Sequence, residues 1–172
     1  NVALGDTALA LSSGDANTAL GASALEANTT ASDNTAVGAR ALYVNTTGSQ
    51  NTAVGRIALA ANTTAPNNTA VGYSVLNANT TGSNNTGVGR SALAANTTAS
   101  NNTALGYNAG TAITTGFNNT FFGSTTGDAL TTGDYNVAVG LSALGAETTG
   151  NKTTPVTPMS LIQQLGLKQE PQ

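Results

Sequence analysis

The sequence predicts an all-β protein, a parallel β-solenoid or β-roll in which each sequence repeat forms one coil. Three observations predict this fold: a strict repeat of 17 residues, a glycine at the fifth position of every repeat, and a polar, turn-forming end to each repeat. A helical fold is excluded because the unit is too short for two helices. It is also crowded with Gly, Thr and Asn, which are poor helix formers.

The repeat comprises nine units over residues 1–152, with the consensus N-T-A-V-G-x-x-A-L-x-A-N-T-T-G-S-N. Positions 1 to 17 below refer to this unit. The first unit begins at Asn1 and is one residue shorter than the others, which begin at Asn17, Asn34, Asn51, Asn68, Asn85, Asn102, Asn119 and Asn136. Residues 153–172 form a separate tail that contains Pro155, Pro158 and Pro171. We expect this tail to cap the open end of the solenoid or to dock on a neighbouring subunit.

Each unit is expected to contain two strands. The first covers positions 2–4, a glycine bend follows at position 5, and the second covers positions 7–11 before a polar loop leads back. The opening asparagines are expected to form a ladder of side-chain amides that bond from coil to coil. The glycines predict a positive φ or a backbone packed too closely for a Cβ atom; they are Gly5, Gly21, Gly38, Gly55, Gly72, Gly89, Gly106, Gly123 and Gly140.

Two apolar columns are predicted to fill the core. Position 4 is always apolar, with Leu4, Leu20, Val37, Val54, Val71, Val88, Leu105, Phe122 and Val139. Position 9 supplies Leu9, Leu25, Leu42, Leu59, Leu76, Leu93 and Leu144, and is glycine in the two remaining units. Because side chains alternate across a strand, the alanines at positions 3 and 8 would then face away from this core.

Such a core is thin, and it predicts an obligate oligomer. Two sizeable apolar side chains per coil, at about 25 cal/mol per Å² buried, hardly offset an ordering entropy of about 1–2 kcal/mol per residue. The outward alanines would supply flat strips where subunits meet. One strip would contain Ala19, Ala36, Ala53 and Ala70, and the other Ala24, Ala41, Ala58 and Ala92.

Composition excludes several classes of function. The chain has no Cys and no His, so it holds neither a Cys/His zinc site nor a disulfide framework nor a His-based catalytic triad. Five Lys and Arg against eight Asp and Glu give no basic footprint for nucleic acid. No run of 18 apolar residues is present that would span a membrane as a helix. The sequence predicts no enzyme, no cofactor and no metal site.

The motif N-T-A-V-G-x-x-A-L resembles the head repeats of trimeric autotransporter adhesins, the YadA-like head family. The 17-residue form with N-T-T-G is similar to repeats of phage tail-fibre and related receptor-binding proteins. The resemblance covers residues 1–152; the adhesin repeat is typically shorter, and the additional residues here fall in the N-T-T-G loop. It implies a left-handed parallel β-roll that packs as a homotrimer, in a non-enzymatic protein of a cell surface or virion fibre.

Two irregular features are candidates for binding. Position 6 reads Arg56, Tyr73, Arg90 and Tyr107 in four consecutive units. Stacking would make this a cation–π column that either stiffens the roll or contacts a glycan or protein partner.

The second irregularity lies in units seven and eight, which contain every Phe of the chain: Phe117, Phe121 and Phe122. Gly110 and Gly127 replace the leucine of position 9 in these units. The aromatic residues either fill the space left by that leucine or form an exposed patch, with Phe117 and Phe121 as candidate binding residues.

Three functions are compatible with the sequence. The first is an extracellular fibre or adhesin module that presents a surface to a glycan or protein receptor. The second is a self-assembling extracellular filament. The third is ice binding through regular threonine columns at position 2. An argument against ice binding is that the same threonines are expected to face inward, beside the apolar residue two positions later.

Overall fold

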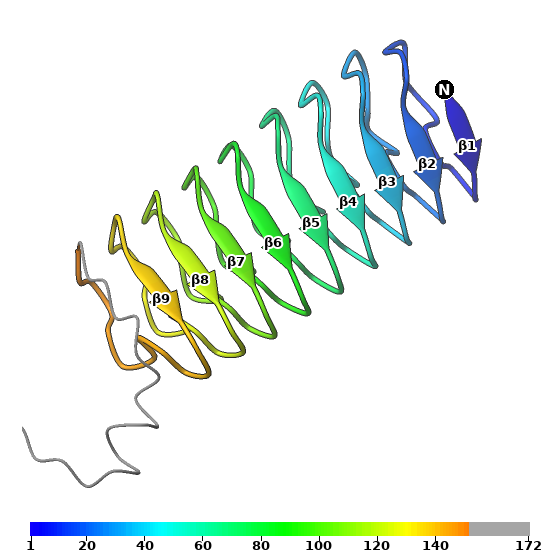
Figure 1. Ribbon diagram of the computed structural model, residues 1–172. Helices are drawn as coiled ribbons and strands as arrows, with labels where there is room; N and C mark the ends of the chain where they lie inside the picture. Colours follow the sequence, from blue (N-terminus) through cyan, green and yellow to red (C-terminus); the bar gives the residue numbers. More distant parts are fainter. Residues whose placement is uncertain (152–172) are drawn as a thin grey trace, which may run out of the picture.

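The computed structural model describes residues 1–151 as a single parallel β-solenoid without helices (Figure 1). Each coil contributes one three-residue strand at positions 2–4, and the nine strands form one sheet in sequence order. They are β1 Val2–Leu4, β2 Thr18–Leu20, β3 Thr35–Val37, β4 Thr52–Val54, β5 Thr69–Val71, β6 Thr86–Val88, β7 Thr103–Leu105, β8 Thr120–Phe122 and β9 Val137–Val139. The predicted solenoid is therefore confirmed. The predicted capping or docking tail, residues 153–172, lies outside the described residues.

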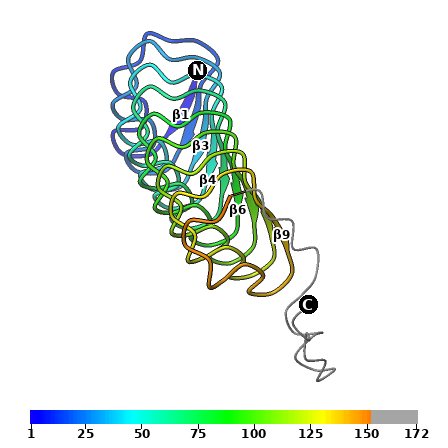
Figure 2. The same cartoon turned by 90° about the vertical axis from the view of Figure 1, so that its left-hand side faces the viewer.

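Neighbouring strands pair in the register of the repeat. Thr52 of β4 lies between Thr35 of β3 and Thr69 of β5, and the following residues pair in the same way. Equivalent residues of successive coils consequently stack into columns along the rod. Figure 2 shows the coils superimposed along this axis, with the strands on one side and the turns and loops on the others.

The predicted second strand does not form, and positions 6–11 are a series of turns instead. Positions 7 and 9 take the left-handed conformation in every coil, as in Arg40 with φ 59° and Leu42 with φ 51°. These reversals turn two consecutive side chains inward, so that Ala41 and Leu42 are both buried. A regular strand would have sent one of them to the surface. The backbone still bonds from coil to coil, with the N–H of Leu42 donating to the carbonyl of Ala58 at 3.0 Å.

The prediction that position 4 lies in the core is wrong. The residue of position 3, which is usually alanine, is buried on each internal strand, and Ala36, Ala53 and Ala70 are fully buried. Because strand residues alternate, positions 2 and 4 face outward. The predicted core residues that lie on the outer side are Leu4, Leu20, Val37, Val54, Val71, Val88, Leu105, Phe122 and Val139, all partly or largely exposed.

The interior is built from alanine and leucine. The alanines of positions 3 and 8 and the leucine of position 9 form one continuous cluster. Leu25, Leu42, Leu59, Leu76 and Leu93 are fully buried, whereas Leu9 and Leu144 of the first and last coils are only partly buried. The predicted alanine contact strips are therefore wrong as well, because both strips line the inside of the solenoid.

Exchanges between coils show how tightly this interior is filled. In β6, Gly87 replaces the alanine of position 3, and a Cβ atom there would lie 2.5 Å from Cγ1 of Val75. Val75 itself replaces the usual alanine of position 8. The larger side chain of Val75 on the turns thus fills the space of the methyl group that Gly87 lacks on the strand, as expected for an interior at crystal-like packing density.

The glycines of position 5 all have φ between 116° and 143°. A Cβ atom on Gly89 would lie 2.5 Å from the carbonyl oxygen of Gly106, the equivalent residue of the next coil. Side chains rarely adopt this φ, and the coils stack too closely at this corner to leave room for one. Both physical reasons for a glycine column therefore hold in the structure.

Buried asparagines satisfy the backbone in the loop corner of each coil. At position 1, each side-chain oxygen accepts the backbone N–H of the next coil's asparagine at 2.8–3.0 Å. At position 12, side-chain amides bond directly from coil to coil at 2.8–3.1 Å, from Asn28 to Asn96. Most amides at both positions also donate to the carbonyl of position 15, as Asn51 and Asn62 do to Ala65, whereas the buried amide nitrogen of Asn34 has no hydrogen-bond partner. The thin core buries little apolar surface, and these ladders of buried hydrogen bonds add to the interactions that hold the coils together.

Candidate functional site: the outer sheet face and an aromatic cleft

The outer sheet face is formed by positions 2 and 4 of β1–β9. Its first column is threonine in seven consecutive strands: Thr18, Thr35, Thr52, Thr69, Thr86, Thr103 and Thr120. Its second column is the apolar series of position 4. Val71 is 36% exposed, Leu105 37% and Phe122 55%. The nearly parallel strand arrows in Figure 1 show how regularly the strands are stacked, and no residue at positions 2 and 4 of these strands is charged.

The Arg–Tyr column of position 6 adjoins the outer sheet face. The guanidinium carbon of Arg56 lies 5.8 Å from the ring centroid of Tyr73, and that of Arg90 lies 5.8 Å from Tyr73 and 5.6 Å from Tyr107. These distances are typical of cation–π pairs. All four side chains are exposed. The column therefore spans four coils, and its geometry is compatible with both a stiffening role and a contact with a glycan or protein partner.

One carboxyl group, that of Glu26 in the turns of the second coil, has a perturbed pKa. Hydrogen bonds from Ser23 and then Thr7, together with the charge of Arg40, lower the pKa of Glu26. The Thr7 hydroxyl donates to the Glu26 carboxylate at 3.0 Å. A lowered pKa means that this contact stabilises the first coils above the usual glutamate pKa and is lost as the pH falls through the lowered value.

Phe121 is not a surface residue, and its assignment as a candidate binding residue is wrong. It occupies position 3 of β8, in place of alanine, and is fully buried. Its ring fills the space of two missing leucines, since a Cβ atom on Gly110 would lie 2.7 Å from the ring and one on Gly127 would also overlap it. The space-filling interpretation of units seven and eight therefore holds for Phe121.

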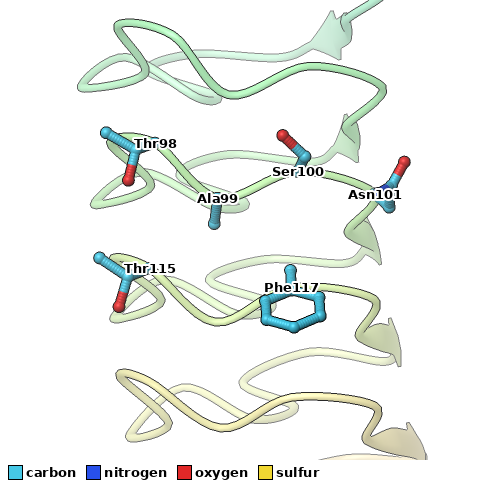
Figure 3. Close-up of a pocket in the computed structure, with 6 residues that line it drawn as sticks. All are labelled: Thr98, Ala99, Ser100, Asn101, Thr115 and Phe117. Atoms are coloured by element: carbon cyan, nitrogen blue, oxygen red, sulfur yellow. The ribbon is translucent and has the colours of Figure 1, made fainter.

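Phe117 lies in the loop that leads into β8 and lines an open cleft of about 330 Å³. Thr98, Ala99, Ser100 and Asn101 of one coil and Thr115 of the next line the remainder (Figure 3). Phe117 is 37% exposed. The edge of its ring contacts Tyr135, with the centroids 5.3 Å apart and the ring planes at 74°. Tyr135 is 51% exposed.

The cleft interrupts a hydrogen-bond ladder at position 16. In most other coils the side chain of this position accepts the backbone N–H of position 16 in the preceding coil. Ser100 accepts the N–H of Ser83 at 3.0 Å, and Asp134 accepts the N–H of Phe117 at 2.9 Å. Phe117 has no oxygen with which to accept the N–H of Ser100. That donor is therefore directed toward the cleft.

The sequence indicated part of this site. The clustering of phenylalanines pointed to Phe117, but the pairing with Tyr135 and the polar wall from Thr98 to Asn101 were missed. The available signal was the substitution of serine by phenylalanine at position 16 of unit seven. Recognising it requires the serine ladder, which becomes visible only when the coils are stacked.

Residues 1–151 contain no cluster of three or more His, Cys, Asp or Glu side chains that could hold a metal ion. Within the same residues, no helix long and apolar enough to cross a membrane is found. Comparisons of the chain with models of protein families, with curated proteins and with solved structures gave no significant match.

Proposed function

We propose that this chain is a rigid, non-enzymatic module of an extracellular fibre or head, in which copies of the chain pack together through the outer sheet face. The observation that carries the proposal is the apolar column of position 4, which lies outside the coil on every strand. The resemblance to adhesin heads and tail fibres favours a homotrimer at a cell surface or on a virion.

The length of the apolar column matters for this assembly. Covering one half-exposed Val or Leu yields on the order of 1 kcal/mol, since full burial of such a side chain is worth about 1.5–3 kcal/mol. Association itself costs about 4–15 kcal/mol. One or two coils would therefore not hold two chains together, whereas a column that runs the length of nine strands would. The uncharged threonines beside it add no desolvation cost of buried charge.

The remaining surfaces stay available when the sheet face is covered. The N-T-T-G loops and the residues that line the cleft at Phe117 belong to positions 12–17, outside the strands of positions 2–4. A fibre built in this way exposes its loops and the turns at position 6, which carry Arg56 and Tyr73, to the surroundings. This division between a self-packing face and a displayed face supports an adhesive or receptor-contacting role.

Val54→Asp is expected to convert the assembled protein into a monomer, because it places a charge in the centre of the apolar column in every copy. Size-exclusion chromatography with light scattering measures the change. Thr64→Asp, which adds the same charge on an exposed loop residue, should leave the mass unchanged.

A second measurement covers the case in which the separated chains also unfold. The melting temperature of the unaltered protein should then rise with protein concentration, as linkage requires of an assembly. A monomer that melts at a temperature independent of concentration would contradict the proposal.

Ice binding is the second candidate, and a specific observation favours it. The expectation that the threonines face inward is wrong: they form a regular outward column on the sheet. A flat, uncharged face with hydroxyl and methyl groups at the strand spacing of about 4.8 Å is suited to ordering water. Ice binding and self-packing require the same face. Thermal hysteresis in a solution of the monomeric chain would favour ice binding, and its absence would leave the fibre module.

A further inference from the structure

We propose that the cleft at Phe117 binds one uncharged pyranose ring of a glycan, stacked on the Phe117 ring and hydrogen-bonded to the backbone N–H of Ser100. The proposal rests on the proposed function in one respect, because it supplies the receptor contact of a displayed fibre surface. It concerns a different side of the coil from the outer sheet face, so that the two proposals are tested separately.

The aromatic ring provides the stacking surface. A pyranose presents a face of C–H groups that packs on an exposed aromatic ring, while its hydroxyls point outward. Tyr135 packs against the Phe117 ring in a T-shaped arrangement, with the centroids 5.3 Å apart and the ring planes at 74°, and the Phe117 side chain remains 37% exposed. Figure 3 shows the ring below Ser100 and Asn101 of the preceding coil, at the open side of the cleft. An exposed aromatic pair held rigidly in this way favours a ligand with both an apolar face and polar edges.

The interrupted ladder provides the hydrogen bond. Position 16 of the next coil normally accepts the N–H that Ser100 directs toward Phe117. A sugar hydroxyl or ring oxygen on the Phe117 ring would take the place of that missing acceptor. Pro66 likewise offers no acceptor to Ser49, but it brings no aromatic ring to its coil. Phe117 is thus the position where a free donor and a stacking surface coincide.

The lining of the cleft selects for an uncharged, hydroxylated ligand. Thr98, Ser100, Asn101 and Thr115 contribute polar residues to the lining, and no lining residue carries a charge. A cavity of 330 Å³ lies at the lower end of the range of about 300–1,000 Å³ for small-molecule sites. That size suits one sugar ring or a disaccharide. A single shallow site binds weakly, and several copies on one fibre would increase the apparent affinity.

The test is saturation-transfer NMR on the full chain with methyl β-galactoside, methyl α-glucoside, lactose and cellobiose as probes, and glucuronate as a charged comparison. We expect transfer from the protein to the C–H face of at least one neutral probe, and weaker transfer to glucuronate. Phe117→Ser should reduce the affinity at least tenfold. This variant restores the serine found at position 16 in other coils, such as Ser100, and is therefore expected to fold.

Tyr107→Ala is the matched control and should leave sugar binding unchanged, because Tyr107 lies in the turn after β7 and does not line the cleft. The proposal is overturned if none of the neutral probes receives saturation, or if Phe117→Ser binds as well as the unaltered chain. Val54→Asp should still bind the sugar, because the cleft is formed within one chain. An unaltered chain that is monomeric but binds the sugar would refute the fibre packing alone. An unaltered chain that assembles but binds none of the neutral probes would refute the glycan site alone.

Discussion

Gly89→Val is expected to destabilise the solenoid more than any surface substitution. The new Cβ atom would lie 2.5 Å from the carbonyl oxygen of Gly106, and φ at this residue is 116°. A β-branched residue takes such a conformation only at a cost of about 1–3 kcal/mol, and overpacking adds about 1–3 kcal/mol. In a chain of this size each kcal/mol lowers the melting temperature by roughly 2–4 °C. Thermal melting followed by circular dichroism should show a decrease of about 10 °C or more.

Gly145→Ala is the control for the effect of removing a glycine. Gly145 lies at position 10, where other coils have residues as large as Tyr43, and its φ is not positive. Its melting temperature should stay close to that of the unaltered chain. An equal and small effect of both substitutions would show that the glycine column does not constrain the backbone.

Ala53→Asp is expected to prevent folding. Ala53 is the middle residue of β4 and is fully buried in the cluster that contains the leucines of position 9. Among residues 1–151, no Lys or Arg is buried that could pair with a carboxylate there. Burial of such a charge costs several kcal/mol, more than a thin core can offset. Circular dichroism should show an unfolded chain at neutral pH, whatever the protein concentration.

Ala39→Asp tests whether this loss depends on burial. Ala39 is exposed at position 6, where the first coil already has Asp6, and the variant should fold normally. Ala53→Asp and Val54→Asp are neighbours on one strand with opposite outcomes, an unfolded chain and a folded monomer. If Ala53→Asp folds and only changes the mass of the assembly, the assignment of position 3 to the interior is wrong.

The sequence predicted the architecture but reversed the two faces of the strand. The repeat length, the strand at positions 2–4 and the glycine corner follow directly from the period and from glycine's conformational freedom. Which face of the strand points into the core does not follow from the sequence. The alternation of side chains allows either face to be buried, and hydrophobicity alone favours burying the valines of position 4 rather than the alanines of position 3. In the folded coil the leucine of position 9 occupies the interior, and the small alanine of position 3 packs in the same cluster. The signal was present where Phe121 coincides with Gly110 and Gly127.

The turns at positions 6–11 were beyond sequence-based prediction for a different reason. Left-handed residues are usually recognised by Gly, Asn or Asp, yet this fold places leucine in that conformation, as in Leu59 with φ 51°. The stacked coils over-determine the backbone there and offset the local strain. Phe117 was identified from the clustering of phenylalanines in units seven and eight. Phe121, the second residue of β8, was misassigned to the surface because its exposure depends on which face of the strand points inward.

Cysteine cross-linking tests most directly whether copies of the chain pack through the outer sheet face. The chain has no native cysteine, so Thr52→Cys places a single thiol on that face and Thr64→Cys places one on the loops. Under mild oxidation, Thr52→Cys should form intermolecular disulfides rapidly at low protein concentration, while Thr64→Cys should remain largely monomeric on a denaturing gel. Equal rates for the two variants, or rapid cross-linking of Thr64→Cys alone, would contradict packing through the sheet.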